Sequence, residues 1–379
     1  MRALHPIKSA CLVFSIQILF SVSLSDSHPL TGSLSDTQTL TGSLSDPHPD
    51  SYGVSRGGLN IFDSQVEEPA LSEAKGGKGD VNTKNPIKIG LLIQNETSVA
   101  AKNGAELAII KANSKGDRGL KFELVVRSME GPWGTGSNQA VTLIFDENVI
   151  AILGSHDGRN AHLVEQVAAK SRVVFLSAWS GDPTLAQAFV PWYFNCVPND
   201  LQQADALIEE IYNKRKLSDI VLVSDKSYDS ESQLNNFLKN VTKQGKAEPL
   251  HFLYDSTGTG INDLTEKITN QKTGCVILFL KPPASVKIIE QIKIKRINLP
   301  VFGSLELLPG ADADYAFDGM NILIEAIRKG GTERENIQKA LAEIKFEGVT
   351  GTIQFDDKGN RKGKPGFVEI KNGIMVPVK

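Results

Sequence analysis

The sequence predicts an α/β protein built from two lobes, each with a parallel sheet covered by helices. The clearest basis is the stretch of residues 150–200, in which a strand, a polar turn and a helix follow one another twice. This alternation is typical of parallel sheets. The chain has 379 residues, too many for one ordinary compact core. Because the alternation recurs on both sides of the stretch, we expect two lobes of similar architecture.

The first lobe is expected to begin near Pro86. Near-continuous apolar runs predict strands covered on both faces, and apolar residues at helical spacing predict the helices between them. Asp182-Pro183 predicts a further helix start, because an N-cap residue precedes a proline at the first helical position. The predicted strands are residues 87–93, 120–126, 149–153, 173–176 and 191–197, with helices at 99–112, around 141–145 and around 163–168.

The second lobe is expected to follow Asn199, which has Gln202 three positions on and so resembles a capping box. Asn372-Gly373 predicts a closing β-hairpin. The predicted strands are residues 220–223, 249–254, 275–280, 352–355, 366–370 and 374–378, with later helices at 316–328 and 334–344. We assign residues 86–197 and 314–346 to lobe one, and residues 198–308 and 347–379 to lobe two.

The first 85 residues are expected to lie outside both lobes. Arg2 and Lys8 precede a short apolar stretch and then small residues, which predicts a secretory signal peptide over residues 1–25. A Ser- and Asp-rich ten-residue repeat follows, so residues 26–85 are predicted to be a disordered low-complexity spacer. We therefore expect an exported protein, periplasmic or extracellular, without a membrane-spanning helix.

Composition and missing motifs exclude several classes of function. Forty-one basic and 44 acidic residues leave a net charge of -3, which argues against nucleic-acid binding and favours a small-molecule partner. The folded region contains no phosphate loop, dinucleotide fingerprint, nucleophile elbow or HExxH motif. We therefore predict no catalytic residues, no cofactor and no enzyme activity.

The spacing of the histidines and the positions of the cysteines give little support for a metal site or a disulfide. His156 and His162 lie six positions apart, whereas two ligands on one helix face need i, i+4 spacing. We expect Asp157 to cap a helix and His162 to lie at the surface. Cys196 and Cys275 could pair in an oxidising compartment, but both fall in apolar strand-like runs, where buried free thiols are favoured.

Polar residues gather where two neighbouring strands of lobe one end. Since parallel strands present their carboxyl ends at one sheet edge, these turns should face a common ligand site. Trp179 could supply a flat apolar wall, and a helix start there offers unpaired amide groups to an anion. In lobe two, Tyr228 follows a strand, and Glu306 is the acid best suited to an ammonium group. The lobe-one residues are Ser155, His156, Asp157, Arg159, Ser177, Ser180 and Asp182.

The order of these parts resembles the type I periplasmic solute-binding proteins, in particular the branched-chain amino-acid and amide branch that serves ABC importers. The similarity covers most of residues 87–378. The segments that carry it are IGLL (89–92), GAELAI (104–109), residues 154–183, PWYF (191–194), PND (198–200), YAFDG (315–319) and GVTGTIQFD (348–356).

The resemblance implies two Rossmann-like lobes joined by a multi-strand hinge, with a ligand held between them. It implies that a ligand carboxylate meets the helix start at Gly158 and the turn from Trp179 to Gly181. Tyr228 and Glu306 would complete an amino-acid cage. The full set of implied ligand-binding residues is Ser155, His156, Asp157, Gly158, Arg159, Trp179, Ser180, Gly181, Tyr228 and Glu306.

Two departures from the family pattern stand out. Asp157, Gly158 and Arg159 occupy a turn where amino-acid binders usually carry small hydroxyl residues. The chain also passes almost directly from Leu308 to Tyr315, where the family has several dozen residues, so one interlobe crossover is shortened.

We therefore expect a monomeric protein that captures a small solute, an amino acid or amide, for an ABC permease. The alternative is a ligand-sensing or degenerate relative that signals to a membrane receptor.

Overall fold

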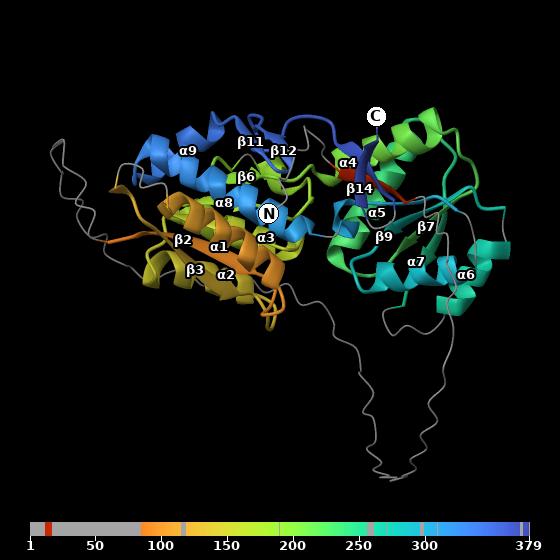
Figure 1. Cartoon of the computed structure of the whole chain (residues 1–379), viewed down its shortest axis with the longest axis horizontal. Coiled ribbons are helices and arrows are strands. Elements are labelled where there is room, and N and C mark those ends of the chain that lie inside the picture. Colours follow the sequence, from red (N-terminus) through yellow and green to blue (C-terminus); the bar gives the residue numbers. More distant parts are fainter. Residues whose placement is uncertain are drawn as a thin grey trace, which may run out of the picture. The chain divides into compact units, whose positions relative to one another are not determined.

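The computed structural model describes residues 12–16, 85–114, 119–188, 190–255, 261–270, 272–295, 299–308, 310–371 and 374–378. Its two larger sheets each have helices packed against them, which confirms the predicted α/β fold with parallel sheets in two lobes (Figure 1). The predicted spacer lies outside the described residues except for Asn85, and so does the turn Asn372-Gly373. The division of the chain between spacer and lobes stays a prediction. Within the described residues, no helix is long and apolar enough to cross a membrane.

Lobe one has a five-stranded parallel sheet in the order β3-β2-β4-β5-β6. Its core combines both faces of the sheet with the helices that cover them, and Leu91, Leu153 and Leu176 are fully buried. The strands are β2 (Ile87–Ile93), β3 (Phe122–Ser128), β4 (Ala151–Gly154), β5 (Val174–Ser177) and β6 (Tyr193–Asn195). The helices are α1 (Val99–Ser114), α2 (Thr135–Val141) with the π-helical turn Thr142–Asp146, and α3 (Gly158–Ser171).

The helices α8 (Ala311–Gly330) and α9 (Arg334–Ala342) belong with lobe one. Figure 1 shows α8 beside α1, and a Cβ at Gly104 of α1 would come within 2.2 Å of the Ala313 carbonyl oxygen. Only glycine permits this close approach of the two helices. The GAELAI segment of α1 therefore contributes to the packing of α8 against lobe one.

Lobe two has a seven-stranded mixed sheet in the order β14-β13-β1-β10-β9-β7-β8. Its four parallel strands are β7 (Ile220–Ser224), β8 (Leu250–Leu253), β9 (Cys275–Phe279) and β10 (Val301–Gly303). The others are β1 (Leu12–Ile16), β13 (Gly366–Lys371) and β14 (Ile374–Val378). The helices are α4 (Asp200–Ile208) with the π-helical turn Glu209–Lys214, α5 (Tyr228–Lys243), α6 (Ile261–Asn270) and α7 (Ala284–Ile294).

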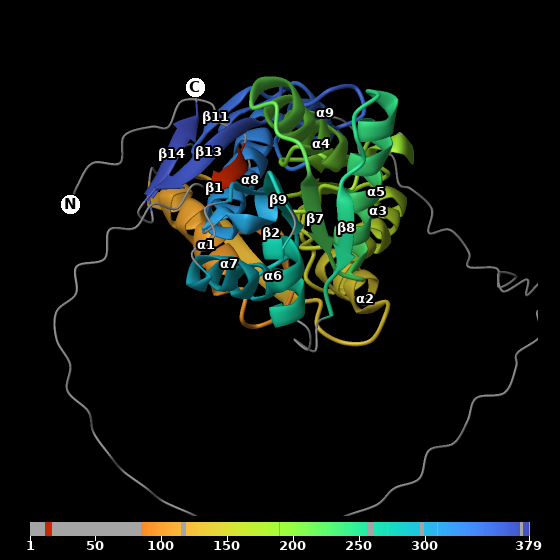
Figure 2. The ribbon, with the colours of Figure 1, turned by 90° about the vertical axis from the view of Figure 1, so that its right-hand side faces the viewer.

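The central strands of the lobe-two sheet, β7 and β9, are buried on both faces, as their apolar runs predict, whereas the edge strand β8 is largely exposed. Val221 and Val223 pack with α6 and α7, whereas Ile220 and Leu222 pack with α4 and α5 (Figure 2). This alternation follows from the period of two along a strand. The capping box of Asn199 and Gln202 is present at the start of α4, as predicted.

Residues 12–16, placed by sequence within the signal peptide, form strand β1 between β10 and β13. The signal peptide itself stays a prediction, since a leader is defined by its removal during export. Leu308 leads into α8 through Gly310, whose φ of 81° is readily adopted by glycine. The structure thus shows the short crossover that the sequence predicts, with a helix that begins earlier than residue 316.

A buried hydrogen-bond network around Asp318 and Arg361 joins the segments that run between the lobes. Asp318 of α8 accepts hydrogen bonds from the backbone N–H groups of Val349 (2.9 Å) and Thr350 (2.8 Å). Arg361 donates to the carbonyl oxygens of Cys196 (2.8 Å) and Thr350 (2.8 Å). Cys196 and Cys275 are both free and buried, which confirms the prediction of lone thiols.

Candidate functional site

The first corner of the site connects β4 to α3. Asp157 is the N-cap of α3 and accepts a hydrogen bond from the backbone N–H of Asn160 at 2.7 Å, as predicted. The Ser155 hydroxyl is buried and donates to the Asp157 carbonyl oxygen at 3.1 Å. Gly158 is therefore the first residue of the helix, where backbone N–H groups lack helical partners and favour an anion.

The second corner follows β5, the parallel neighbour of β4, so both corners lie at one sheet edge as predicted. The predicted helix at Asp182-Pro183 is wrong. Asp182 does accept the Thr184 backbone N–H at 2.8 Å, but only a single 3-10 turn follows, at Leu185–Ala188. The chain then enters β6 at Tyr193. The site thus has one helix start instead of two.

The two corners are joined by an aromatic stack. The rings of His156 and Trp179 are parallel within 8°, with centroids 4.0 Å apart. Burial of the imidazole, and then the positive charge of Lys281, lower the pKa of His156 from 6.5 to about 3. His156 is therefore neutral at physiological pH and serves, with Trp179, as a flat wall.

His162 has a more specific position than the predicted surface role. Its Nε2 lies 3.0 Å from Asp182 Oδ2 and 2.9 Å from the Thr184 hydroxyl. Hydrogen bonds to Asp182 and Glu165 raise the pKa of His162 to about 9. Burial alone would raise the pKa of Asp182, but hydrogen bonds from His162, Thr184 and Tyr228 lower it to about 2. The two side chains form an ion pair at neutral pH.

The different surroundings of His156 and His162 predict that the two histidines titrate at very different pH values. In NMR spectra His162 should titrate near pH 9, against 6.5 for an unperturbed histidine, while His156 should stay neutral down to about pH 3. Because folding raises the pKa of His162, its contribution to stability is complete below 6.5 and is lost as the pH rises through about 9. In an Asp182→Asn variant the His162 pKa should fall and that of His156 should not. A His162 that titrates at 6.5 in the wild type would contradict the pair.

Lobe two reaches this sheet edge through the start of α5. The Tyr228 hydroxyl donates to Asp182 Oδ2 at 2.7 Å. Asp229, the next residue, accepts the Gly158 backbone N–H on its Oδ1 at 2.8 Å. Burial and the hydrogen bond to Asp182 raise the pKa of Tyr228 to about 12, so it remains a donor. The helix start in lobe one thus holds a carboxylate that belongs to lobe two.

Lys281, just after β9, carries the second connection. Its Nζ donates to the His156 carbonyl oxygen at 3.1 Å and to Asp229 Oδ2 at 2.6 Å, and lies 3.3 Å from Glu306 Oε1. Although burial disfavours its charge, Glu306 and Asp229 raise the pKa of Lys281 above its ordinary value. Burial raises the pKa of Glu306, and Lys281 opposes that rise. We call Gly158, Asp182, Tyr228, Asp229, Lys281 and Glu306 the interlobe cluster.

A further buried acid borders the cluster. Asp200, the first residue of α4, accepts the Ser232 hydroxyl on Oδ2 at 2.7 Å, while no hydrogen bond reaches its Oδ1. A Cβ added at Gly181 would come within 2.3 Å of this Oδ1. Burial raises the pKa of Asp200 well above its ordinary value. Any side chain at position 181 would therefore collide with the Asp200 carboxylate, so the second corner requires glycine there.

The structure brings most of the predicted site residues into one place. Ser155, His156, Asp157, Gly158, Trp179, Ser180 and Gly181 lie at the two corners, and Tyr228 and Glu306 reach them through Asp182 and Lys281. Arg159 is exposed. The sequence interpretation omitted Asp229, Lys281 and Asp200 and dismissed His162. Lys281 follows a lobe-two strand just as Tyr228 does, and that position was the available signal.

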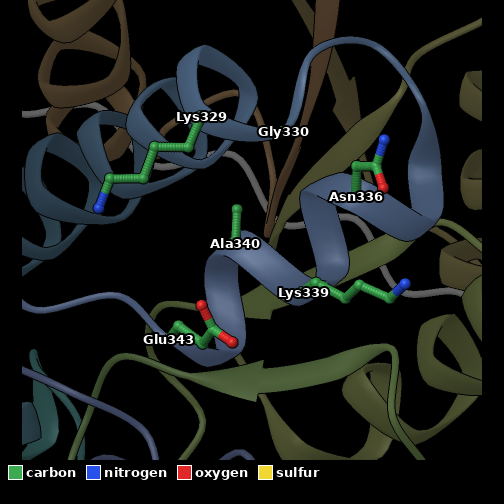
Figure 3. Close-up of a pocket in the computed structure, with 6 residues that line it drawn as sticks. All are labelled: Lys329, Gly330, Asn336, Lys339, Ala340 and Glu343. Carbon is green, nitrogen blue, oxygen red and sulfur yellow. The ribbon is translucent and has the colours of Figure 1, made fainter.

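The described part of the chain contains no cluster of His, Cys, Asp and Glu suited to a metal. A hollow of about 360 Å³ lies elsewhere, between the end of α8 and α9 (Figure 3). Its lining is Lys329, Gly330, Asn336, Lys339, Ala340 and Glu343, none of which belongs to the interlobe cluster.

Two parallel-sheet lobes whose strand ends meet through buried polar groups define a class of two-lobed α/β binding proteins. The chain belongs to the periplasmic binding protein family, whose model matches residues 86–300.

Solved structures support the same fold at low sequence identity. An ABC transporter substrate-binding protein from Desulfitobacterium hafniense, in complex with Leu, is 18% identical over 78% of this chain and 100% of its own, with a TM-score of 0.66. A solute-binding protein of an R. palustris ABC transporter, in complex with benzoate, is 17% identical over 78% and 96%, with a TM-score of 0.67. A branched-chain amino acid transporter substrate-binding protein from Streptococcus pneumoniae, in complex with isoleucine, is 17% identical over 78% and 100%, with a TM-score of 0.65.

Proposed function

We propose that this protein captures a small solute between its two lobes, at the edge where β4 and β5 end. The observation that carries the proposal is the hydrogen bond from Gly158 N–H to a carboxylate of the opposite lobe. The start of α3 thus donates to a carboxylate that comes from lobe two, and helix N-termini favour such anions. Solute binding would bring the lobes together because a bound solute contacts both.

We propose that the solute is an amino acid or amide that carries a free carboxylate group. The ligands named for the three similar structures, leucine, isoleucine and benzoate, all contain a carboxyl group. The His156–Trp179 stack would cover an apolar part of the solute, and the Ser155 and Ser180 hydroxyls lie at the same corners. Glu306 supplies an acid for an ammonium group. Gly181 and Asp157 shape the two corners, and exposed Arg159 would attract the anion.

After capture, the closed form would be recognised by an ABC permease, with the protein acting as an exported monomer in the periplasm or outside the cell. The short passage from Leu308 to α8 favours one alternative, a sensing relative that reports ligand occupancy to a membrane receptor. A permease partner would bind the closed form and receive the solute, whereas a receptor would bind without any transfer. A reconstituted transport assay separates the two functions.

Ligand-induced thermal stabilisation tests the proposal. The chain should be screened against amino acids and aromatic acids, each paired with the amide that replaces its carboxylate, such as leucine with leucinamide and benzoate with benzamide. A solute that binds only the folded state at about 100 times its Kd adds about 2.7 kcal/mol to stability. We expect at least one acid to raise the melting temperature and its amide partner to raise it less. A flat response of a folded protein across the panel would contradict solute capture.

A further inference from the structure

The interlobe cluster already contains the two charges that an amino acid would bring. Asp229 places a carboxylate on Gly158 N–H at 2.8 Å, and Lys281 places an ammonium group 2.6 Å from Asp229 and 3.3 Å from Glu306. Both side chains come from lobe two, and both reach backbone groups of lobe one. The carboxylate occupies the helix start that a solute carboxylate would need.

The contacts form one continuous bridge between the lobes. Lys281 Nζ donates to the His156 carbonyl oxygen at 3.1 Å, two residues before Gly158. The Asp229 and Glu306 side chains are 11% and 16% exposed, so water screens these charges only weakly. One N–H group and one carbonyl oxygen of the same corner are therefore satisfied by an internal ion pair.

We propose that Asp229 and Lys281 act as a built-in competitor for the solute, so that the lobes close on an internal ion pair when no solute is present. This inference rests on the proposed solute-binding site and assigns Asp229 a specificity-determining role. A solute must present its own carboxylate to Gly158 to displace Asp229. The site therefore favours carboxylates over neutral amides, and its affinity is reduced by the fraction of molecules that are closed on themselves.

The first experiment needs no solute. Nitroxide labels on Asn103→Cys in α1 and Lys287→Cys in α7, both exposed positions, report the interlobe distance by pulsed electron resonance. Cys196 and Cys275 are buried, and a Cys11→Ser change made in every labelled protein removes the remaining native thiol, which leaves the introduced thiols for labelling. Asp229→Ala should shift the population to longer distances. Asp229→Asn, which keeps an oxygen for Gly158 N–H but loses the ion pair, should lie between Asp229→Ala and the wild type.

The matched control is Glu231→Ala, which removes an exposed acid from the same first turn of α5. It should leave the distance distribution of the wild type unchanged. An Asp229→Ala distribution identical to that of the wild type would overturn the inference, whatever the solute. This result would leave the proposed function standing, so the two ideas fail separately.

The second experiment uses the acid from the thermal panel that stabilises the protein most. If about nine molecules in ten are closed on the internal pair, Asp229→Ala should bind this acid about tenfold more tightly. Glu231→Ala should bind it as the wild type does. An Asp229→Ala variant that binds the acid more weakly would show Asp229 to be a direct contact of the solute and would overturn the inference. If no acid in the panel binds, the proposed function fails, and the distance measurement alone decides whether the internal pair closes the lobes.

Discussion

Replacing Lys281 by methionine should cost this protein about 2 kcal/mol of folding free energy at neutral pH. The change leaves Asp229 and Glu306 facing one another without their shared cation. Removing one partner of a fully buried ion pair costs about 3–5 kcal/mol, and exposed pairs contribute about 0–1 kcal/mol. The Lys281 side chain is 34% exposed, so the expected loss lies between these limits.

The deficit of the Lys281→Met variant should depend on pH in a defined direction. Lys281 opposes the rise that burial imposes on the pKa of Glu306, so its removal lets this pKa rise further. A carboxyl group whose folded pKa is raised takes up a proton more readily in the folded state, which favours folding as the pH falls. Measured by urea unfolding, the difference from the wild type should therefore shrink between pH 7 and pH 5.

Two further variants test the origin of this deficit. Lys287→Met removes an exposed lysine of α7 and should change stability little. Glu306→Gln added to Lys281→Met should recover part of the loss, because it removes one of the unpaired acids. An equal loss in both lysine variants, or a deficit independent of pH, would contradict the ion cluster.

Gly158→Ala should destabilise the protein by about 1–3 kcal/mol, the usual cost of overpacking. A Cβ at this position would lie 2.8 Å from Tyr228 Cε1 and 3.0 Å from Asp182 Cβ. In an open helix, alanine in place of glycine would instead stabilise by up to about 1 kcal/mol. The sign of the change therefore tests whether Tyr228 is packed against the helix start. Solute affinity should fall at least tenfold, since both lobes would be pushed apart at the site.

A double-mutant cycle provides the control. If Tyr228 causes the clash, Gly158→Ala and Tyr228→Ala together should cost less than the sum of the two single changes, because contacting residues are not additive. Their free energies of unfolding can be compared by urea denaturation of the four proteins. Strict additivity, or a stabilised Gly158→Ala variant, would show that the lobes do not meet at this point.

Local patterns in the sequence predicted most of the strands and helices. β2 was predicted with the bounds that the structure has, and Asp157 and Asn199 both cap helices as expected. Such features depend on residues within a few positions of one another, through periodic burial and side-chain bonds to the next helical turn. The error at Asp182 shows the limit of this reasoning. The local hydrogen bond to Thr184 forms, but the chain continues as a 3-10 turn and then enters β6.

The candidate site was predicted in part. The corners at Gly158 and Trp179 follow from two adjacent strands of one parallel sheet, a local pattern combined with a general rule of topology. The hydrogen bond between His162 and Asp182 was not predicted because the two residues lie 20 positions apart, at different corners. Asp229 was missed because it follows Tyr228 in a polar stretch typical of any exposed helix start.

The sequence by itself determined the architecture and the sheet edge at which polar residues gather. Both follow from burial periodicity and helix capping, which depend on residues only a few positions apart. Only the tertiary structure decided which charges meet there. Asp229 and Gly158 are 71 residues apart, and Lys281 and His156 are 125 apart. Contacts over such separations depend on how two independently built lobes come together, and nothing in the local order of residues specifies that.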